Sequence, residues 1–206
     1  MKEKTYKTYI FSELEEKVQE DLIQEFRNVN VECDFWYEYV VEGFIEDMKD
    51  YGFDIESKDI QFSGFGHQSD GASFECSDID LRIFIDTLNA TERDTYLQIL
   101  DDENIHDICL SVGRCSSHYF HSITMHGISD WLIDLPYDTK EEKEEYDYIE
   151  MNLNQLHIDM TDFAKESAHR LYKDLETEHD NMTSDETVIE FLVANEYGFF
   201  EDGRMA

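Results

Sequence analysis

The stretch DIQFSGFGHQSDGASFEC, from Asp59 to Cys76, carries the clearest fold signal in the chain. Apolar and polar residues alternate over 59–65, which is typical of a half-buried strand. The Gly- and Ser-rich segment that follows ends in Asp70-Gly71, a pair that favours a turn. Residues 72–76 then have the composition of a second strand. This stretch therefore predicts a β-hairpin.

Helical patterns lie on both sides of this hairpin. A capping box of Ser12 with Glu15 precedes apolar residues at helical spacing and predicts a helix over 13–27. A second helix is expected over 35–51, with Asp34 as its N-cap and Gly52 at its C-terminal stop. On the other side, we expect helices over 91–101, over 156–179, and from a Thr183 and Glu186 capping box to Asn195.

Further strands are expected at the ends and in the middle of the chain. Residues 5–11 are rich in β-branched and aromatic side chains, and 107–114 with 117–127 form a plausible second hairpin. The tail at 197–200 could add an edge strand, while 79–88 fits either a strand or a helix. The whole chain, 1–206, is therefore expected to form one α+β domain, in which helices pack on an antiparallel sheet of about four to six strands.

The chain is strongly acidic but not poor in apolar residues. Its 206 residues include 50 Asp and Glu against 16 Lys and Arg, for a formal net charge of −34, yet 41% are hydrophobic and 14% aromatic. Acidic disordered chains lack aromatic residues, so a folded core is expected. The charge repels nucleic acid and acidic membrane surfaces, which excludes direct binding to either. A partner of such a surface should itself be basic.

The remaining composition bears on cellular location. No apolar run is long enough for a signal peptide or a membrane span. The four cysteines are scattered without a Cys-x-x-Cys pair, which favours reduced thiols and a cytoplasmic location. No metal ion or other cofactor is expected from the sequence.

A dense acidic segment is the first candidate site. On a helix, side chains three and four residues apart are neighbours about 5–6 Å apart, near the spacing of successive phosphates along a strand. These carboxylates could therefore mimic the phosphates of DNA or RNA for a basic partner. The alternative is a solvated acidic face that only aids solubility, or adaptation to high salt. The expected partner-binding residues are Asp138, Glu141, Glu142, Glu144, Glu145, Asp147 and Glu150.

The loop of the first hairpin and two histidines form the second candidate site. Gly residues permit tight turns there, and polar side chains could bind a small ligand, although no Lys is present for a phosphate-binding loop. A metal or phosphoesterase site built with the histidines is a further option. The alternative is a hairpin loop held by its own hydrogen bonds. The candidate residues are Gln68, Asp70, Ser73, His118 and His121.

The chain also resembles a family of small acidic proteins from bacteriophage and prophage genomes. Members show a segment like Phe-Ser-Gly-Phe-Trp-Ser-Gln-Gly-Asp-Gly-Ala, and residues 62–72 are similar to it, with Gly66 and His67 in place of Trp and Ser. Other matches occur in the same order, at residues 11–14, 34–38, 118–121, 183–186, 194–197 and 201–203. The resemblance implies a phage accessory protein, sometimes labelled an antitoxin, and it supplies no catalytic residue.

Charge and resemblance together lead to one expected function. The chain would be a phage-encoded inhibitor that binds a basic, nucleic-acid-binding host protein, such as a restriction or CRISPR effector, in the host cytoplasm. It would contact neither nucleic acid nor membrane directly, and a homodimer is left open. Two alternatives remain: an antitoxin-like protein that neutralises a basic toxin, or a small-ligand or metal-binding enzyme that uses the second candidate site.

Overall fold

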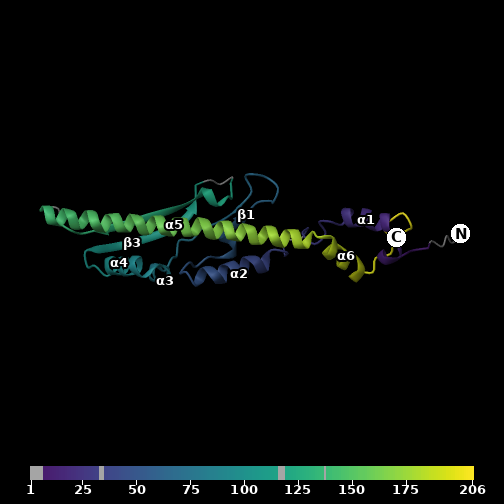
Figure 1. The fold of residues 1–206 in the computed structure, drawn as a ribbon, viewed down its shortest axis with the longest axis horizontal. Helices are drawn as coiled ribbons and strands as arrows, with labels where there is room; N and C mark the ends of the chain where they lie inside the picture. The colour runs from purple at the N-terminus through teal and green to yellow at the C-terminus, as the bar shows by residue number, and fades with distance from the viewer. Residues whose placement is uncertain (1–6, 33–34, 116–118, 137) are drawn as a thin grey trace. The chain divides into compact units, whose positions relative to one another are not determined.

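The computed structural model describes residues 7–32, 35–115, 119–136 and 138–206, and its elements are labelled in Figure 1. The helices are α1 (Glu16–Glu25), α2 (Glu38–Lys49), α3 (Leu81–Asp86), α4 (Ala90–Leu100), α5 (Lys140–Met182) and α6 (Asp185–Ala194). The strands are β1 (Ile60–Phe62), β2 (Ala72–Phe74), β3 (Ile105–Arg114) and β4 (Met125–Ile133). Short 3-10 turns are η1 (Phe11–Glu13), η2 (Ser57–Asp59) and η3 (Ser122–Thr124).

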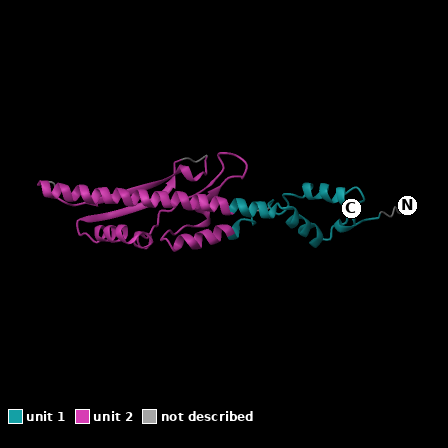
Figure 2. Cartoon of the chain, in the orientation of Figure 1, with its two compact units in different colours: residues 1–39, 175–206 teal, residues 40–174 magenta. Residues whose placement is uncertain are grey.

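The chain divides into two compact units, coloured separately in Figure 2. Unit 1 combines Met1–Tyr39 with Leu175–Ala206, and unit 2 is Val40–Asp174. Two helices, α2 and α5, contribute residues to both units. Each unit is described separately below.

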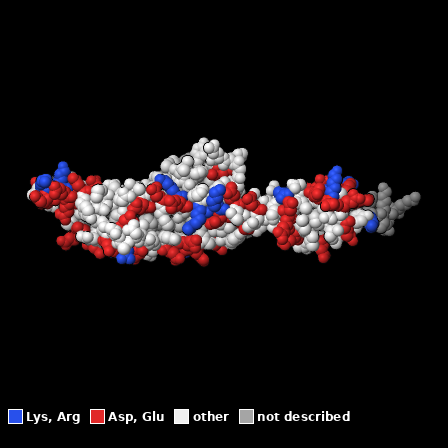
Figure 3. All heavy atoms as spheres, in the orientation of Figure 1, with Lys and Arg blue, Asp and Glu red and all other residues white. Residues whose placement is uncertain are grey.

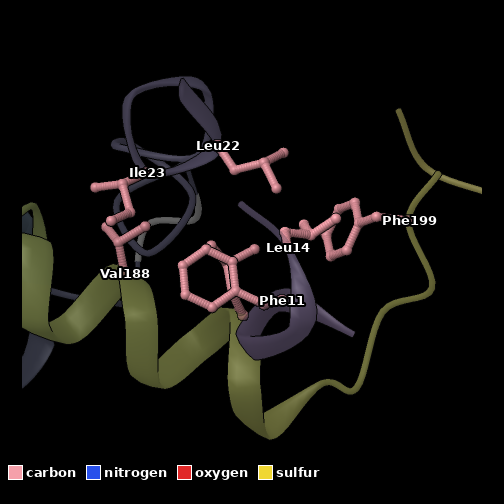
Figure 4. Close-up of a cluster of buried hydrophobic side chains, with 7 residues drawn as sticks. Phe11, Leu14, Leu22, Ile23, Val188 and Phe199 are labelled. Carbon is pink, nitrogen blue, oxygen red and sulfur yellow. The ribbon is translucent and has the colours of Figure 1, made fainter. Parts of the chain in front are cut away.

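Unit 1 has an apolar core that joins the two ends of the chain. Its buried side chains come from η1, α1, α6 and the C-terminal tail, and Figure 4 shows six of them facing one another. They are Phe11, Leu14, Leu22, Ile23, Val188, Leu192 and Phe199. The tail is tied to the N-terminal segment by Tyr9 and Phe199, which exchange two backbone hydrogen bonds of 2.8 Å each. The prediction of strands at 5–11 and 197–200 is therefore wrong for the described residues, because each segment forms only isolated bridges.

The helix ends of unit 1 correct two expected capping boxes. Ser12 lies inside η1, and Glu13 rather than Glu15 turns back to accept from the backbone N–H of Ile10, 3.2 Å away. Consequently α1 begins at Glu16, without a side-chain cap. At the other end, the Thr183 hydroxyl donates to the His179 carbonyl in the last turn of α5. Ser184, one residue later, therefore caps α6 by accepting from Thr187 N–H at 3.3 Å.

The sheet of unit 2 is smaller than expected. The described residues form two antiparallel pairs, β1 with β2 and β3 with β4, joined by a single bridge between Cys76 and Val112. The mixed helix-and-strand class and the first hairpin are confirmed, but a sheet of four to six strands is wrong. One reason is the ambiguous apolar segment after the hairpin, which becomes α3 because the Asp80 carboxylate accepts from the N–H groups of Arg82 and Ile83.

The second hairpin is longer than expected and shifted in register. β3 agrees with the expected strand at 107–114, but its partner β4 lies beyond most of the expected 117–127. Between the strands, the described residues 122–124 form η3. His121 caps this turn, because its ring Nδ1 accepts from the backbone N–H of Ile123 at 3.1 Å. This extra turn delays the return strand, so Gly127 pairs with Val112 and Met125 with Arg114.

Helix α5 supplies much of the unit 2 core. It is one 43-residue helix that includes both the acidic segment and the expected helix over 156–179. Buried side chains recur along one of its faces because they follow the spacing of three and four residues: Ile149, Leu153, Leu156, Met160, Ala164, Ala168 and Leu171. Ile149 and Leu153 pack with Ile99 of α4 and Ile105 of β3.

An aromatic cluster completes unit 2. Phe53 is fully buried and its ring lies 5.6 to 6.3 Å from those of Phe74, Phe84 and Phe163. Gly52, which ends the turn after α2 as expected, has a φ of +84°, a conformation that favours glycine. Among the described residues, no helix combines the length and apolarity that crossing a membrane requires.

Candidate acidic interface

The first turn of α5 uses part of the expected acidic row for its own capping. The Thr139 hydroxyl accepts from Glu142 N–H at 3.2 Å, and the Glu142 carboxylate accepts from the N–H groups of Thr139 and Asp138 at 2.9 and 3.1 Å. These bonds, led by the one from Thr139 N–H, lower the pKa of Glu142. Glu142 is therefore a helix-capping carboxylate, and Asp138 lies in the turn before the helix.

The other five acidic residues of the row are exposed on α5. Glu141, Glu144, Asp147 and Glu150 follow each other at three-residue intervals, while Glu145 lies beside the first of them. With about 3.6 residues per turn and a rise of about 1.5 Å per residue, this row winds half-way round the helix over about 14 Å. Glu144 is also paired with Lys140 at 3.1 Å, although both groups are well exposed and the pair contributes little stability. The acidic row is therefore present, but curved and partly neutralised.

Between and beyond its acidic residues, α5 exposes apolar side chains. Tyr148, Met151 and Ile158 have 51%, 60% and 48% of their surface exposed. Figure 3 shows a broad area without charged side chains beside the acidic left-hand end, at the position of α5 in Figure 1. The acidic composition of 138–150 conceals this face, because Tyr148 lies among carboxylates and Met151 and Ile158 lie further along the helix. Continuing the buried helical stripe back from Leu156 to Ile149 would have placed them on the opposite, exposed face.

In the second candidate site, Asp70 stabilises the hairpin loop itself. Its Oδ2 accepts from the N–H groups of Gly66 and His67 at 2.9 and 2.7 Å, and these two bonds lower its pKa. The Ser63 hydroxyl accepts from Gly71 N–H at 3.2 Å on the other side of the loop. The loop is thus closed by hydrogen bonds between its own polar groups, which agrees with the alternative of a hairpin loop that holds itself together. Gln68 is exposed at its tip.

The structure brings this loop against His121. A Cβ placed on Gly71 would lie 2.6 Å from the Cα of His121, so only glycine allows this approach. Ser73 is fully buried nearby in β2, and its Oγ has no hydrogen-bond partner among the described residues. The Nδ1 of His121 already accepts from Ile123 N–H, while His118 lies outside the described residues. Over the described ranges, no three His, Cys, Asp or Glu side chains are grouped to hold a metal ion.

An acidic pocket of about 470 Å³ lies beside β3, and no pattern in the sequence predicts it. Its walls come from residues 54–59 and 75–78, with Val112, Gly113 and Ile128 on the strand side. The carboxylates that line it are Asp54, Glu56, Asp59, Glu75 and Asp78, with Lys58 as the cation. Their spacing in sequence is irregular, so only the fold brings them together.

Cys76 and Arg114 hold the walls of this pocket in place. The Cys76 thiol donates to the backbone carbonyls of Asp78 and Asp54 at 3.2 and 3.4 Å, and burial raises its pKa to about 11. Arg114, whose side chain is only 11% exposed, donates to Glu75 at 3.0 Å and to Gln61 at 2.8 Å. The pocket is therefore a fixed structure in which Glu75 is already paired.

Comparison with known proteins adds a family but no function. No curated protein and no solved structure matches the chain. A family model described as a domain of unknown function (DUF8835) matches residues 36–185. This range contains all of unit 2, including the acidic turns and exposed apolar residues of α5, the hairpin loop and the pocket. Because the match covers most of the chain, the protein belongs to the DUF8835 family.

Proposed function

We propose that this protein works by binding a basic, nucleic-acid-handling protein through its acidic surface. The supporting observation is the charge excess: with 50 acidic and 16 basic residues, at least 34 carboxylates have no Lys or Arg of their own to pair with. Figure 3 shows acidic groups over much of the visible face. Carboxylates at this density would occupy the Lys and Arg side chains that otherwise hold phosphates.

Energetics favour a functional use of this charge. Like charges three or four residues apart on a helix destabilise it by a few tenths of a kcal/mol per pair. A strong single-sign field also speeds the encounter with an oppositely charged partner and repels nucleic acid. An electrostatic decoy gains from both effects, whereas the folded chain alone gains from neither.

The resemblance to phage and prophage proteins narrows the class of target. A phage protein benefits from inhibiting a host defence enzyme that acts on nucleic acid. The proposed target is therefore a restriction or CRISPR effector in the host cytoplasm. An antitoxin that neutralises one basic toxin would use the same surface in the same way. The identity of the captured protein distinguishes the two.

The experiment is capture of host proteins by the tagged full chain at 0.1 M and 1 M salt. Screening lengths are about 10 and 3 Å at these concentrations, so a decoy contact should be lost at the higher one. The captured protein is then purified and its binding to DNA or RNA is measured with and without the chain. Competition with nucleic acid supports the proposal, and a captured toxin without nucleic-acid activity supports the antitoxin alternative. Salt-insensitive capture, or binding without competition, argues against a decoy.

Two matched variants locate the binding surface. The first neutralises four exposed residues of α5 with Glu141→Gln, Glu144→Gln, Glu145→Gln and Asp147→Asn, and keeps Glu142 as the cap. The second makes the same charge change around α1 with Glu15→Gln, Glu16→Gln, Glu20→Gln and Asp21→Asn. If α5 is the contact, only the first weakens capture. Equal weakening would mean that total charge, rather than α5, is responsible.

A further inference from the structure

Three exposed apolar side chains lie on one face of α5. We define the α5 stripe as Tyr148, Met151 and Ile158, each about half exposed or more. Their spacing of three and seven residues puts them within about 80° of one another around the helix and spreads them over about 15 Å of its length. They belong to one face of one helix, inside unit 2.

This stripe has the composition of an interface centre. Isolated exposed apolar residues are ordinary on protein surfaces, but these three share one face of one helix. Tyr and Met are enriched at the centres of protein–protein interfaces, where charged residues are depleted. The opposite face of α5 already packs into the unit 2 core through Leu153 and Leu156. The stripe is therefore the side of α5 left for another molecule.

Carboxylates lie at both ends of the stripe. Glu144 and Asp147 lie four residues before Tyr148 and Met151, so they border its N-terminal end on the same face. At the other end, the Asp159 carboxylate accepts from the Tyr96 hydroxyl at 2.7 Å and from Gln155 at 2.8 Å.

Asp162, further along, pairs with Lys165 at 3.3 Å. Both ends of the stripe therefore have an ion-paired carboxylate, Glu144 with Lys140 and Asp162 with Lys165, and Asp147 adds a further negative charge beside Met151.

We propose that the α5 stripe is the centre of a docking surface for a basic partner protein. The partner would place apolar side chains on Tyr148, Met151 and Ile158, and Lys or Arg side chains beside Glu144 and Asp147. This inference rests on the proposed function and specifies the chemistry of the partner at the same surface.

Charge complementarity selects this occupant. A second copy of the chain would bring another formal charge of −34 onto the acidic rim, and nucleic acid would be repelled in the same way. Stable protein interfaces bury roughly 800 Å² per partner, which three side chains cannot supply alone. The apolar stripe and the acidic rim must therefore be covered together, by a surface that is apolar at its centre and basic at one edge.

The test uses two synthetic peptides of equal positive charge. One is an amphipathic helix with Leu on one face and Lys on the other, and the second has Gln in place of each Leu. The affinity of each peptide is measured by calorimetry at 0.15 M salt, for the wild-type chain and for two variants. The stripe variant is Tyr148→Gln, Met151→Gln, Ile158→Gln. The control variant, Ile10→Gln, Ile123→Gln, Val193→Gln, removes apolar side chains of 47%, 75% and 52% exposure elsewhere.

The proposal predicts a selective loss. The stripe variant should weaken binding of the Leu peptide at least tenfold, leave the Gln peptide unchanged, and melt within a few degrees of the wild type; the control variant should change neither affinity. If both peptides bind and the stripe variant affects neither, the stripe proposal fails while the acidic decoy stands. If neither peptide binds, the decoy fails as well. A dimer of the chain in sedimentation that the stripe variant dissociates would show that the occupant is a second copy.

Discussion

At the scale of single residues, His157 of α5 makes the stability of unit 2 depend on pH. Burial, and then the charge of neighbouring His126, lower the pKa of His157 below its ordinary 6.5. Its Nδ1 is buried without a hydrogen-bond partner among the residues described, so a proton there would have no acceptor. The imidazolium form is therefore disfavoured in the folded chain but not in the unfolded one.

The sign of the effect follows from this lowered pKa. The contribution of neutral His157 to the free energy of unfolding is complete above about pH 6.5. It is lost as pH falls toward the folded-state pKa, because the unfolded chain then binds more protons than the folded one. We expect the unfolding free energy to fall between pH 7.5 and 5.5, by less than about 1.4 kcal/mol per pH unit, the limit for one proton. Urea unfolding measures this, and His157→Gln should flatten the dependence. The control His106→Gln, at an exposed position, should leave the pH dependence unchanged. If it also flattens the dependence, burial of His157 is not its cause.

Cysteine reactivity offers a second prediction at this scale. Cys76 is buried and its pKa is raised to about 11, whereas Cys109 and Cys115 are exposed. Since the thiolate is the reactive form, iodoacetamide at pH 8 should modify Cys109 and Cys115 much faster than Cys76. Mass spectrometry of peptides over time measures the three rates. Rapid modification of Cys76 in the folded chain would mean that the pocket wall opens readily.

At the scale of elements, local signals predicted the fold better than pairing signals did. The hairpin of β1 and β2 could be read from the sequence because its turn is held by nearby groups such as Asp70 and Ser63. The position of β4 could not be predicted from the sequence. It depends on the η3 turn and on the register of pairing with β3, which are set by contacts made only after folding. Likewise, the acidic segment was predicted, but its exposed apolar stripe became visible only when α5 was seen as one helix.

The packing of β4 on α5 depends on one glycine. A Cβ on Gly127 would lie 2.8 Å from Cε1 of His157 and would collide with the Thr161 hydroxyl. Thr161 is buried and its hydroxyl donates to the His157 carbonyl, so it cannot move away freely. Gly127→Ala should therefore destabilise the chain by about 1–3 kcal/mol, as overpacking does.

The matched control for this change is Gly43→Ala in α2. Apart from its chain neighbours and the backbone of its own helix, no atom of the described residues lies within 4 Å of the added Cβ, and alanine favours a helix over glycine by up to about 1 kcal/mol. The two substitutions add the same methyl group and should shift the thermal midpoint in opposite directions. A neutral or stabilising Gly127→Ala would show that β4 and α5 are less tightly packed at this point than the structure has them.

At the scale of the whole molecule, the structure has two compact units with separate cores. That 1–206 folds as one domain stays a prediction. The family match contains all of unit 2, which carries the acidic turns, the α5 stripe and the pocket. Unit 1 joins residues from both ends of the chain, a pairing that no local pattern reveals because its partners are far apart in sequence. The proposed binding surface therefore depends on unit 2, and unit 1 should be separable from it in stability.

Leu22→Ala tests this separation. Leu22 is buried in the unit 1 core, which also contains Phe11 and Val188, and its truncation should cost about 2–5 kcal/mol. If the units unfold separately, amide hydrogen exchange should accelerate in α1 and α6 while β3, β4 and the first half of α5 keep wild-type protection. The equivalent change in unit 2, Leu153→Ala, should accelerate exchange in β3 and α4 instead. Equal acceleration in both units after either change would show that 1–206 folds as one cooperative domain, because damage to one core would then be transmitted through α5 to the other.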